Sequence, residues 1–348
     1  MLVLEDGTVF YGKPFGASKA VSGEVVFNTG MVGYTEAITD PSYKGQILCQ
    51  TYPLIGNYGV SEDDFESDSP KIEGYIVSEI CKKPNHRTAQ KSLDSFLAEH
   101  GVPGIAGIDT RALTKKLRMK GVMLGVLSTE DGTAPETKIP DPNETDLVEK
   151  VTISKPIFYE NAGKTVVVMD CGVKMNIIRS LLERKLNVIR VPASYAADRI
   201  MELKPDGILI SNGPGDPKKV DYVIEATRQL IEYKMPVFGI CLGIQILALA
   251  MGGNTYKLKF GHRGQNHTCM DLKTKRCYIT SQNHGYAVDA ASLNDCEITF
   301  LNVNDKTVEG IEHKSLPVFG VQFHPEAAPG PTDTKFLFDK FVKMMNNE

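Results

Sequence analysis

The chain has 348 residues, of which 42% are hydrophobic and 24% are charged, and its formal net charge is −4. This length predicts about two domains, and the slightly acidic balance argues against binding to nucleic acid or to an anionic membrane surface. No apolar run reaches the ~18 residues of a membrane span, and the first residues lack the basic and apolar regions of a signal peptide.

The first 128 residues are predicted to form short strands broken by turn residues, which indicates a β-rich α+β domain over 1–150. A D-G pair inside LVLEDGTVFYG favours a hairpin at 2–12. Apolar residues at helical spacing predict one helix at 87–101. A second helix is predicted at 109–121, with Asp109 as its N-cap and Gly121 as its C-cap.

A polar segment rich in Pro and Thr at about 129–163 indicates a connector, with a helical fragment near residue 145. The chain then alternates apolar strands with amphipathic helices, which predicts a doubly wound, mostly parallel α/β sheet with helices on both faces over 163–348. The predicted strands are 165–170, 186–192, 206–212 and 235–240, the predicted helices are 176–185, 196–204, 220–234 and 242–253, and hairpin-like strands with a last helix at 334–347 follow.

Seven cysteines are scattered along the chain without a C-x-x-C pair. This pattern is typical of reduced thiols in a cytoplasmic protein and not of a disulfide framework. The sequence pattern most similar to a metal-binding cluster consists of His262, His267 and Cys269 in the stretch GHRGQNHTC. Because no second half with matching spacing accompanies them, we predict no metal site.

Cys241 lies between two glycines in VFGICLG, where a buried strand ends and a helix begins. The pattern is that of a nucleophile elbow, in which Gly239 and Gly243 leave room for a sharp turn. The turn lies at the carboxyl end of a strand, where open α/β sheets bind ligands. The alternative is a small buried thiol in an ordinary turn, and Cys171, which also follows a strand, is the rival nucleophile.

A nucleophilic thiol needs a base, and the base needs a group that orients it. His324 ends an apolar run and is followed by Pro325 and Glu326, so the carboxylate can hold one ring nitrogen while the other faces the thiol. A strand end with an exposed histidine is the alternative interpretation. His284, in a polar turn without an obvious carboxylate, is the second candidate base.

The segment SNGPGDP follows the third strand of the second half and can lie beside the loop that carries Cys241. Backbone N–H groups near Gly213 and Gly215, with the N–H of Leu242, could then form an oxyanion hole. By itself the segment also fits a simple turn.

These motifs together resemble the class I (triad) glutamine amidotransferases. The β-rich first half, with GIDTRALTKKLR and SQNHGYAV, is similar to the family of small, glutaminase subunits of carbamoyl-phosphate synthases, and the likeness covers nearly the whole chain. The resemblance implies that Cys241 forms a γ-glutamyl thioester, that His324 is the base and that Glu326 orients it. Family positions that contact L-glutamine fall on Ser42, Gly213, Gly215, Leu242, Gln245, Asn283, Gly285 and Tyr286. The family often has His where this chain has Ile244, and Phe where it has Tyr286, which affects only fine substrate contacts.

The resemblance also implies a large synthetase subunit that receives the ammonia and uses bicarbonate and ATP to form carbamoyl phosphate, for arginine or pyrimidine biosynthesis. This chain has no G-x-x-x-x-G-K-[ST] loop, so we expect no cofactor here and place ATP and Mg²⁺ on the large subunit. Two other hypotheses stay open at this point: a stand-alone hydrolase with a Cys-His-Glu triad, and a scaffold that only binds the large subunit.

Overall fold

The computed structural model describes residues 1–130 and 139–347. Two compact units make up the chain, Met1–Leu147 and Val148–Glu348. The sequence predicts domains at 1–150 and 163–348. The structure differs at their boundary, because it assigns the segment 148–162 to the second unit. Residues 131–138 of the predicted connector lie outside the described residues.

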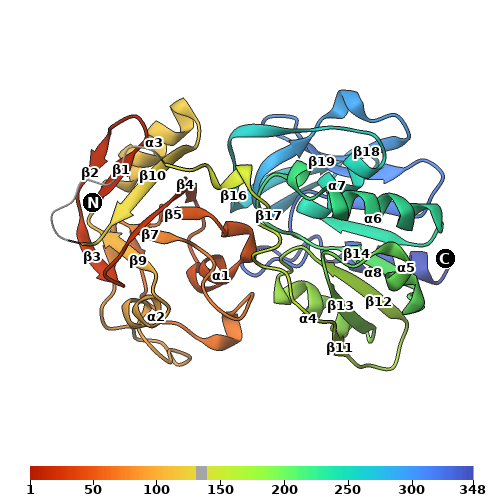
Figure 1. Ribbon diagram of the computed structural model, residues 1–348, viewed down its shortest axis with the longest axis horizontal. Coiled ribbons are helices and arrows are strands. Elements are labelled where there is room, and N and C mark those ends of the chain that lie inside the picture. Colours follow the sequence, from red (N-terminus) through yellow and green to blue (C-terminus); the bar gives the residue numbers. More distant parts are fainter. Residues whose placement is uncertain (131–138, 348) are drawn as a thin grey trace. The chain divides into compact units, whose positions relative to one another are not determined.

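A mixed eight-stranded sheet forms the centre of the first unit (Figure 1), in the order β2-β1-β10-β4-β5-β7-β9-β3. The predicted D-G hairpin is confirmed, because Leu2 pairs with Phe10. Strands β4, β5, β7 and β9 run parallel, which the sequence pattern did not indicate. The strands are β1 Leu2–Leu4, β2 Val9–Phe10, β3 Lys13–Gly16, β4 Ala20–Asn28, β5 Gln46–Gln50, β6 Leu54–Ile55, β7 Gly74–Val77, β8 Glu79–Ile80, β9 Pro103–Ala106 and β10 Met123–Ser128.

The α-helices in the described part of this unit are α1 Tyr34–Thr39, α2 Leu93–Glu99 and α3 Thr110–Lys120. Helix α3 has the predicted ends, since the Asp109 carboxylate accepts from the N–H of Ala112 at 2.8 Å and Gly121 follows the last turn with φ 110°. Helix α2 is shorter than the predicted 87–101, because the Ser92 hydroxyl caps it by accepting from the N–H of Ser95 at 3.1 Å. In place of the helical fragment near 145 there is one 3-10 turn, Pro142–Glu144.

The second unit is built on a ten-stranded sheet (Figure 1), in the order β11-β13-β12-β14-β15-β20-β19-β18-β16-β17. Strands β13, β12, β14, β15 and β20 are parallel, and the others are antiparallel. The strands are β11 Ile157–Tyr159, β12 Thr165–Asp170, β13 Asn187–Pro192, β14 Gly207–Ile210, β15 Val237–Ile240, β16 Thr255–Asp271, β17 Cys277–Val288, β18 Cys296–Asn302, β19 Val308–His313 and β20 Val318–Val321.

Helices cover both faces of this sheet, as the sequence predicts for a doubly wound fold. Along β12, Val167 and Met169 enter the core under α5, α6 and α7, whereas Val166 and Val168 enter the core under α4 and α8. Burial of both faces explains why the parallel strands are apolar without alternation. The helices are α4 Met175–Glu183, α5 Ala197–Glu202, α6 Asp221–Glu232, α7 Leu242–Ala250 and α8 Phe336–Met345.

Two strands of the second unit were not predicted. Strand β11 pairs antiparallel with β13 inside the segment interpreted as a connector. Strand β16 occupies the glycine-rich stretch, and its pairing with β17 is interrupted by register shifts between Lys257 and His262 and between Gly264 and His267. Among the described residues, no helix combines the length and the apolar composition that a membrane crossing requires.

Aromatic side chains hold α8 against the sheet. Phe238 stacks on Phe319 with ring centroids 4.4 Å apart, and fully buried Phe338 meets Phe238 edge-on at 5.8 Å. Phe338→Ala removes this contact and leaves a cavity, so we predict a loss of about 3–5 kcal/mol in the free energy of unfolding, measured by urea titration. Phe336→Ala, at a position that is 39% exposed, is the matched control and should cost less than about 1 kcal/mol. Equal losses for the two variants would contradict this packing.

Candidate active site

Cys241 occupies the turn between the last residue of β15 and the first residue of α7. Its φ of 55° and ψ of −101° place it in a region that residues other than glycine rarely adopt. Strained positions of this kind cost about 1–3 kcal/mol and cluster at functional sites. The N–H of Cys241 donates to the carbonyl of Val321 at 2.9 Å, which ties the turn to β20. This backbone is that of a nucleophile elbow.

The glycines on either side of Cys241 are required by close backbone contacts. A Cβ on Gly239 would lie 2.7 Å from the carbonyl carbon and oxygen of Gly243, and a Cβ on Gly243 would lie 2.2 Å from the carbonyl oxygen of Ile210. Both distances are far below van der Waals contact. The G-x-C-x-G pattern is therefore a steric requirement of the turn and its neighbour β14.

His324 reaches the elbow from the segment that follows β20. Its N–H donates to the carbonyl of Ser281 at 2.9 Å, which fixes this segment against β17. On the side chain, Nδ1 lies 2.6 Å from Oε1 of Glu326. Among the described residues Nε2 has no hydrogen-bond partner, and the imidazole interacts electrostatically with Cys241. The imidazole is therefore held by the carboxylate on one side and leaves its other nitrogen uncommitted.

Lys174 adds a further charged group beside the Glu326 carboxylate. Its Nζ lies 3.1 Å from Oε1 of Glu326 and donates to the carbonyl of Ala327 at 2.5 Å. The side chain is only 3% exposed, and that of Glu326 is fully buried. Asn176 contributes a further bond, from its amide to the backbone carbonyl of Glu326. Both residues come from the segment that follows β12, which holds the carboxylate of Glu326 through Lys174 and its backbone through Asn176.

The interactions among these side chains keep the imidazole of His324 and the carboxylate of Glu326 charged near neutral pH. Burial works against the imidazolium, but the charge of the Glu326 carboxylate, with a smaller contribution from Cys241, outweighs it and raises the pKa of His324 to about 10. Burial likewise works against the carboxylate, but Lys174 and His324 together lower the pKa of Glu326 to about 2. The buried site therefore contains several charged side chains, and the pKa of each depends on the charge of its neighbours.

The reaction centre is more enclosed than the sequence pattern predicts. The elbow motif predicts a thiol presented to substrate, whereas Cys241 and His324 are each only 2% exposed. Exclusion of water strengthens the interactions between the charged groups.

The SNGPGDP segment lies against the elbow, as expected for a loop that follows the neighbouring parallel strand β14. A Cβ on Gly213 would lie 2.8 Å from Cδ2 of Leu242 and 2.1 Å from the carbonyl oxygen of Cys171. Gly215 has a φ of 83°, which favours glycine. Asn212 links this loop to the charged chain, because its side-chain oxygen accepts from the N–H of Lys174 at 3.0 Å.

Strand β17 carries three of the positions that the resemblance assigns to glutamine, Asn283, Gly285 and Tyr286. The carbonyl of Asn283 lies 3.6 Å from Sγ of Cys241, so this strand borders the thiol. Gln245 on α7 is buried, and its amide nitrogen donates to the carbonyl of Tyr286 at 2.9 Å and to Gln322 at 3.0 Å. In this structure Gln245 holds β17 against α7.

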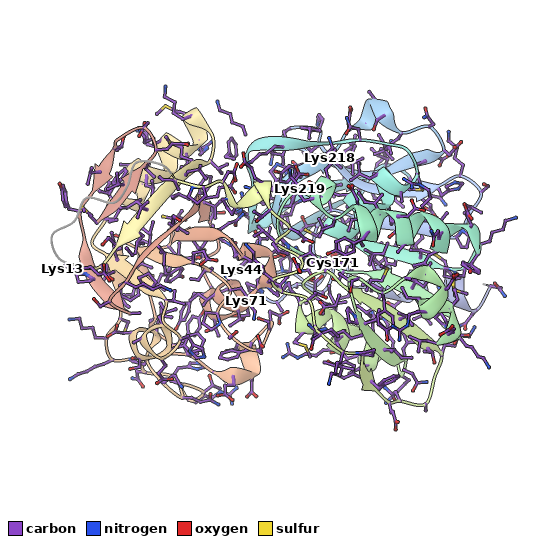
Figure 2. The ribbon with its side chains drawn as sticks, in the orientation of Figure 1. Lys13, Lys44, Lys71, Cys171, Lys218 and Lys219 are labelled. Atoms are coloured by element: carbon purple, nitrogen blue, oxygen red, sulfur yellow. The ribbon has the colours of Figure 1, made fainter. Side chains whose placement is uncertain are left out.

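Ser42 belongs to the first unit, where it lies in the 3-10 turn Pro41–Tyr43. Its N–H donates to the Asp40 carboxylate at 2.9 Å, and the residue is buried. Cys171, the rival nucleophile (Figure 2), is fully buried and packs in the apolar core of the second unit.

His284, the second candidate base, has both ring nitrogens engaged away from the thiol. Nδ1 lies 2.7 Å from the carbonyl of Tyr286, and Nε2 lies 2.8 Å from Oε1 of Gln282. Burial lowers its pKa well below the usual range, which keeps the ring neutral. Its position favours a structural role in β17.

A buried polar cluster surrounds His284, and it differs from the metal candidate considered from sequence. The side chains whose ligand atoms converge within 4.8 Å are His262, His284 and Glu309, in place of His262, His267 and Cys269. Both nitrogens of His262 already have partners, Gln282 at 3.0 Å and Asp305 at 2.8 Å. That the chain holds no metal stays a prediction.

Sequence reasoning missed Lys174 and Asn176. The only available signal was their place directly after a predicted parallel strand, at the edge where ligands bind.

Comparison with known proteins shows that the chain belongs to the class I glutamine amidotransferases. Residues 167–344 match the family model of glutamine amidotransferase class-I, and residues 2–127 match that of the carbamoyl-phosphate synthase small chain, CPSase domain.

Relatives that match over nearly their full length identify the family of the whole chain. The chain is 51% identical to the carbamoyl phosphate synthase small chain of Methanocaldococcus jannaschii, over 100% of this chain and 99% of the relative. It is 50% identical to the carbamoyl phosphate synthase small chain of Archaeoglobus fulgidus, over 99% and 98% of the two chains. It is 48% identical to the carbamoyl phosphate synthase pyrimidine-specific small chain of Bacillus subtilis, over 99% and 95%. The chain belongs to the family of carbamoyl phosphate synthase small chains, which confirms the resemblance seen in the sequence.

Lys174 acts through Glu326, so its replacement should change the pH dependence of activity. In Lys174→Met the carboxylate loses its ammonium partner and its pKa rises. We predict a lower kcat for glutamine hydrolysis, a KM that changes little, and an acidic limb that rises from its wild-type position near the Glu326 pKa of about 2 into the measured range, followed as glutamate release between pH 4 and 9. Lys174→Arg keeps the charge and should retain the wild-type limb. An unshifted limb in Lys174→Met would show that the lysine only supports the fold.

Proposed function

We propose that this chain hydrolyses the side-chain amide of L-glutamine and that the ammonia passes to a large synthetase subunit, which forms carbamoyl phosphate. The observation that carries the proposal is the imidazole of His324 between the Cys241 thiol and the Glu326 carboxylate, at a strained elbow. The match of the first unit to the carbamoyl-phosphate synthase small-chain domain supports the choice of partner.

In the first half-reaction, Sγ of Cys241 attacks the amide carbon of glutamine. The thiolate is the reactive form of a cysteine nucleophile. The carbonyl oxygen becomes an oxyanion, and we assign the N–H of Leu242 and backbone N–H groups near Gly213 to its stabilisation. The carbon–nitrogen bond then breaks, His324 donates its proton to the departing nitrogen, and ammonia leaves a γ-glutamyl thioester.

In the second half-reaction, water attacks the thioester carbon and gives a proton to His324. The carbon–sulfur bond breaks, glutamate leaves and the thiolate is restored. Glu326 keeps the same nitrogen of His324 engaged throughout, at 2.6 Å, so the other nitrogen stays directed at the reacting atoms. Positions proposed to contact glutamine are Ser42, Gly213, Gly215, Leu242, Gln245, Asn283, Gly285 and Tyr286.

The remaining chemistry is proposed to occur on the large subunit, which would bind bicarbonate, ATP and Mg²⁺. The product would feed arginine or pyrimidine biosynthesis, and the Bacillus subtilis relative is named pyrimidine-specific. We propose a cytoplasmic location, because a thiol nucleophile needs a reducing compartment to stay active.

Two other functions are less well supported. A scaffold role would not require the buried chain of Cys241, His324, Glu326 and Lys174, whose charges are costly to bury. A stand-alone hydrolase would not account for the match of the first unit to a small-chain domain.

Cys241→Ser tests the proposed nucleophile in the complex with the large subunit. Because the hydroxyl is a far weaker nucleophile than the thiolate, we predict that glutamine-dependent synthesis of carbamoyl phosphate is abolished. Synthesis from added ammonia should remain at the wild-type rate, which also controls for assembly. Cys171→Ser is the matched control and should keep glutamine-dependent activity. Glutamine-dependent activity that survives in Cys241→Ser would contradict the assignment of Cys241 as the nucleophile.

A further inference from the structure

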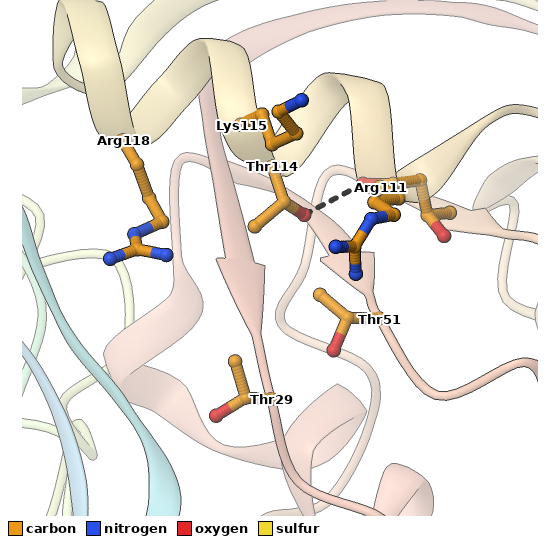
Figure 3. A pocket seen from close by; sticks show the side chains of 7 residues that line it. Thr29, Thr51, Arg111, Thr114, Lys115 and Arg118 are labelled. Carbon is orange, nitrogen blue, oxygen red and sulfur yellow. Dashed lines mark hydrogen bonds between the residues drawn. The ribbon is translucent and has the colours of Figure 1, made fainter.

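The first unit contains a pocket that the proposed glutamine chemistry does not use. It lies under helix α3, has a volume of about 300 Å³, and is lined by Thr29, Thr51, Thr110, Arg111, Thr114, Lys115 and Arg118. Figure 3 shows the side chains of Arg111 and Arg118 extending from the helix toward the space bordered by Thr29 and Thr51.

The floor of this pocket is the carboxyl edge of two parallel strands. Thr29 directly follows β4 and Thr51 directly follows β5, and the strands pair up to their last residues, Asn28 and Gln50. The N–H of Thr51 donates to the carbonyl of Asn28 at 3.0 Å, which keeps the two strand ends together. The pocket therefore rests on rigid backbone, at the edge where α/β sheets commonly bind ligands.

The charge of the pocket is entirely positive. Arg111, Lys115 and Arg118 are spaced to lie on one face of α3, and within the described part of the chain none of the three forms an ion pair. Lys116 on the same helix does have a partner, Asp6, at 2.6 Å. No carboxylate lines the pocket, although the whole chain carries a net charge of −4. The pocket is thus complementary to an anion.

The surroundings of the pocket favour a protein partner over a small anion. All three cationic side chains are exposed, and an ion held by exposed side chains gains little in water. Arginine is enriched in protein interfaces, where a partner excludes water from the charge pairs.

We propose that this pocket is a docking site for an acidic segment of the large subunit. A carboxylate of that segment enters between Arg111 and Arg118 and accepts hydrogen bonds from the guanidinium groups and the threonine hydroxyls. The inference rests on the proposed function for the existence of the large subunit, and it assigns the surface that binds it.

The test compares two double variants of the full chain in titrations with its cognate large subunit. Arg111→Gln with Arg118→Gln should raise the Kd of the complex by about tenfold or more, and should reduce the dependence of the Kd on salt. Lys82→Gln with Arg87→Gln removes the same charge from exposed positions of the same unit, and should leave the Kd within about twofold of wild type.

Three results would overturn the docking site. The first is an unchanged Kd for the Arg111 and Arg118 variant, and the second is an equal weakening by the control variant. The third is stabilisation of wild type, but not of the variant, by inorganic phosphate at matched ionic strength without any change in the Kd, which would identify a small-anion site. Failure of the proposed function is separable, because it would appear as wild-type complexes that form normally but make no carbamoyl phosphate from glutamine.

Discussion

The contact on which the site depends is the one between the Glu326 carboxylate and the imidazole of His324, 2.6 Å apart and without access to water. Two charges buried together are costly unless each has further partners. Lys174 supplies the counter-charge on one side, and the Cys241 thiol completes the chain on the other. Thiol, imidazole and carboxylate are therefore coupled, so that a change in the charge of one alters the charge state of its neighbour.

The fold brings these groups together through the parallel order of β12, β14, β15 and β20. Lys174 follows the first of these strands, Gly213 the second, Cys241 the third and His324 the fourth, so all four segments meet at one edge of the sheet. The elbow at Cys241 stores backbone strain in this edge, and its flanking glycines allow the close approach of β14. Core packing on both faces of the sheet holds the strained turn in place.

Local patterns in the sequence predicted the doubly wound half, and G-x-C-x-G and H-P-E pointed to Cys241, His324 and Glu326, which the structure places at the same edge of the sheet. Lys174 could not be predicted, since its bond to Ala327 spans 153 positions of the chain. Strand β16 was missed because register shifts break the alternation on which strand prediction depends. The parallel strands of the first unit were missed because mostly irregular segments join them, without the long amphipathic helices that reveal βαβ units.

The most direct measurement is the rate of glutamate release by His324→Asn, compared with His284→Asn, each in the complex with the large subunit. If His324 transfers the proton, its replacement slows glutamine hydrolysis by ~10²–10⁴-fold, the usual contribution of a general acid–base group, and the second variant keeps most of the activity. A His324→Asn rate within about tenfold of wild type, with a larger loss in His284→Asn, would contradict the coupled site described for this chain.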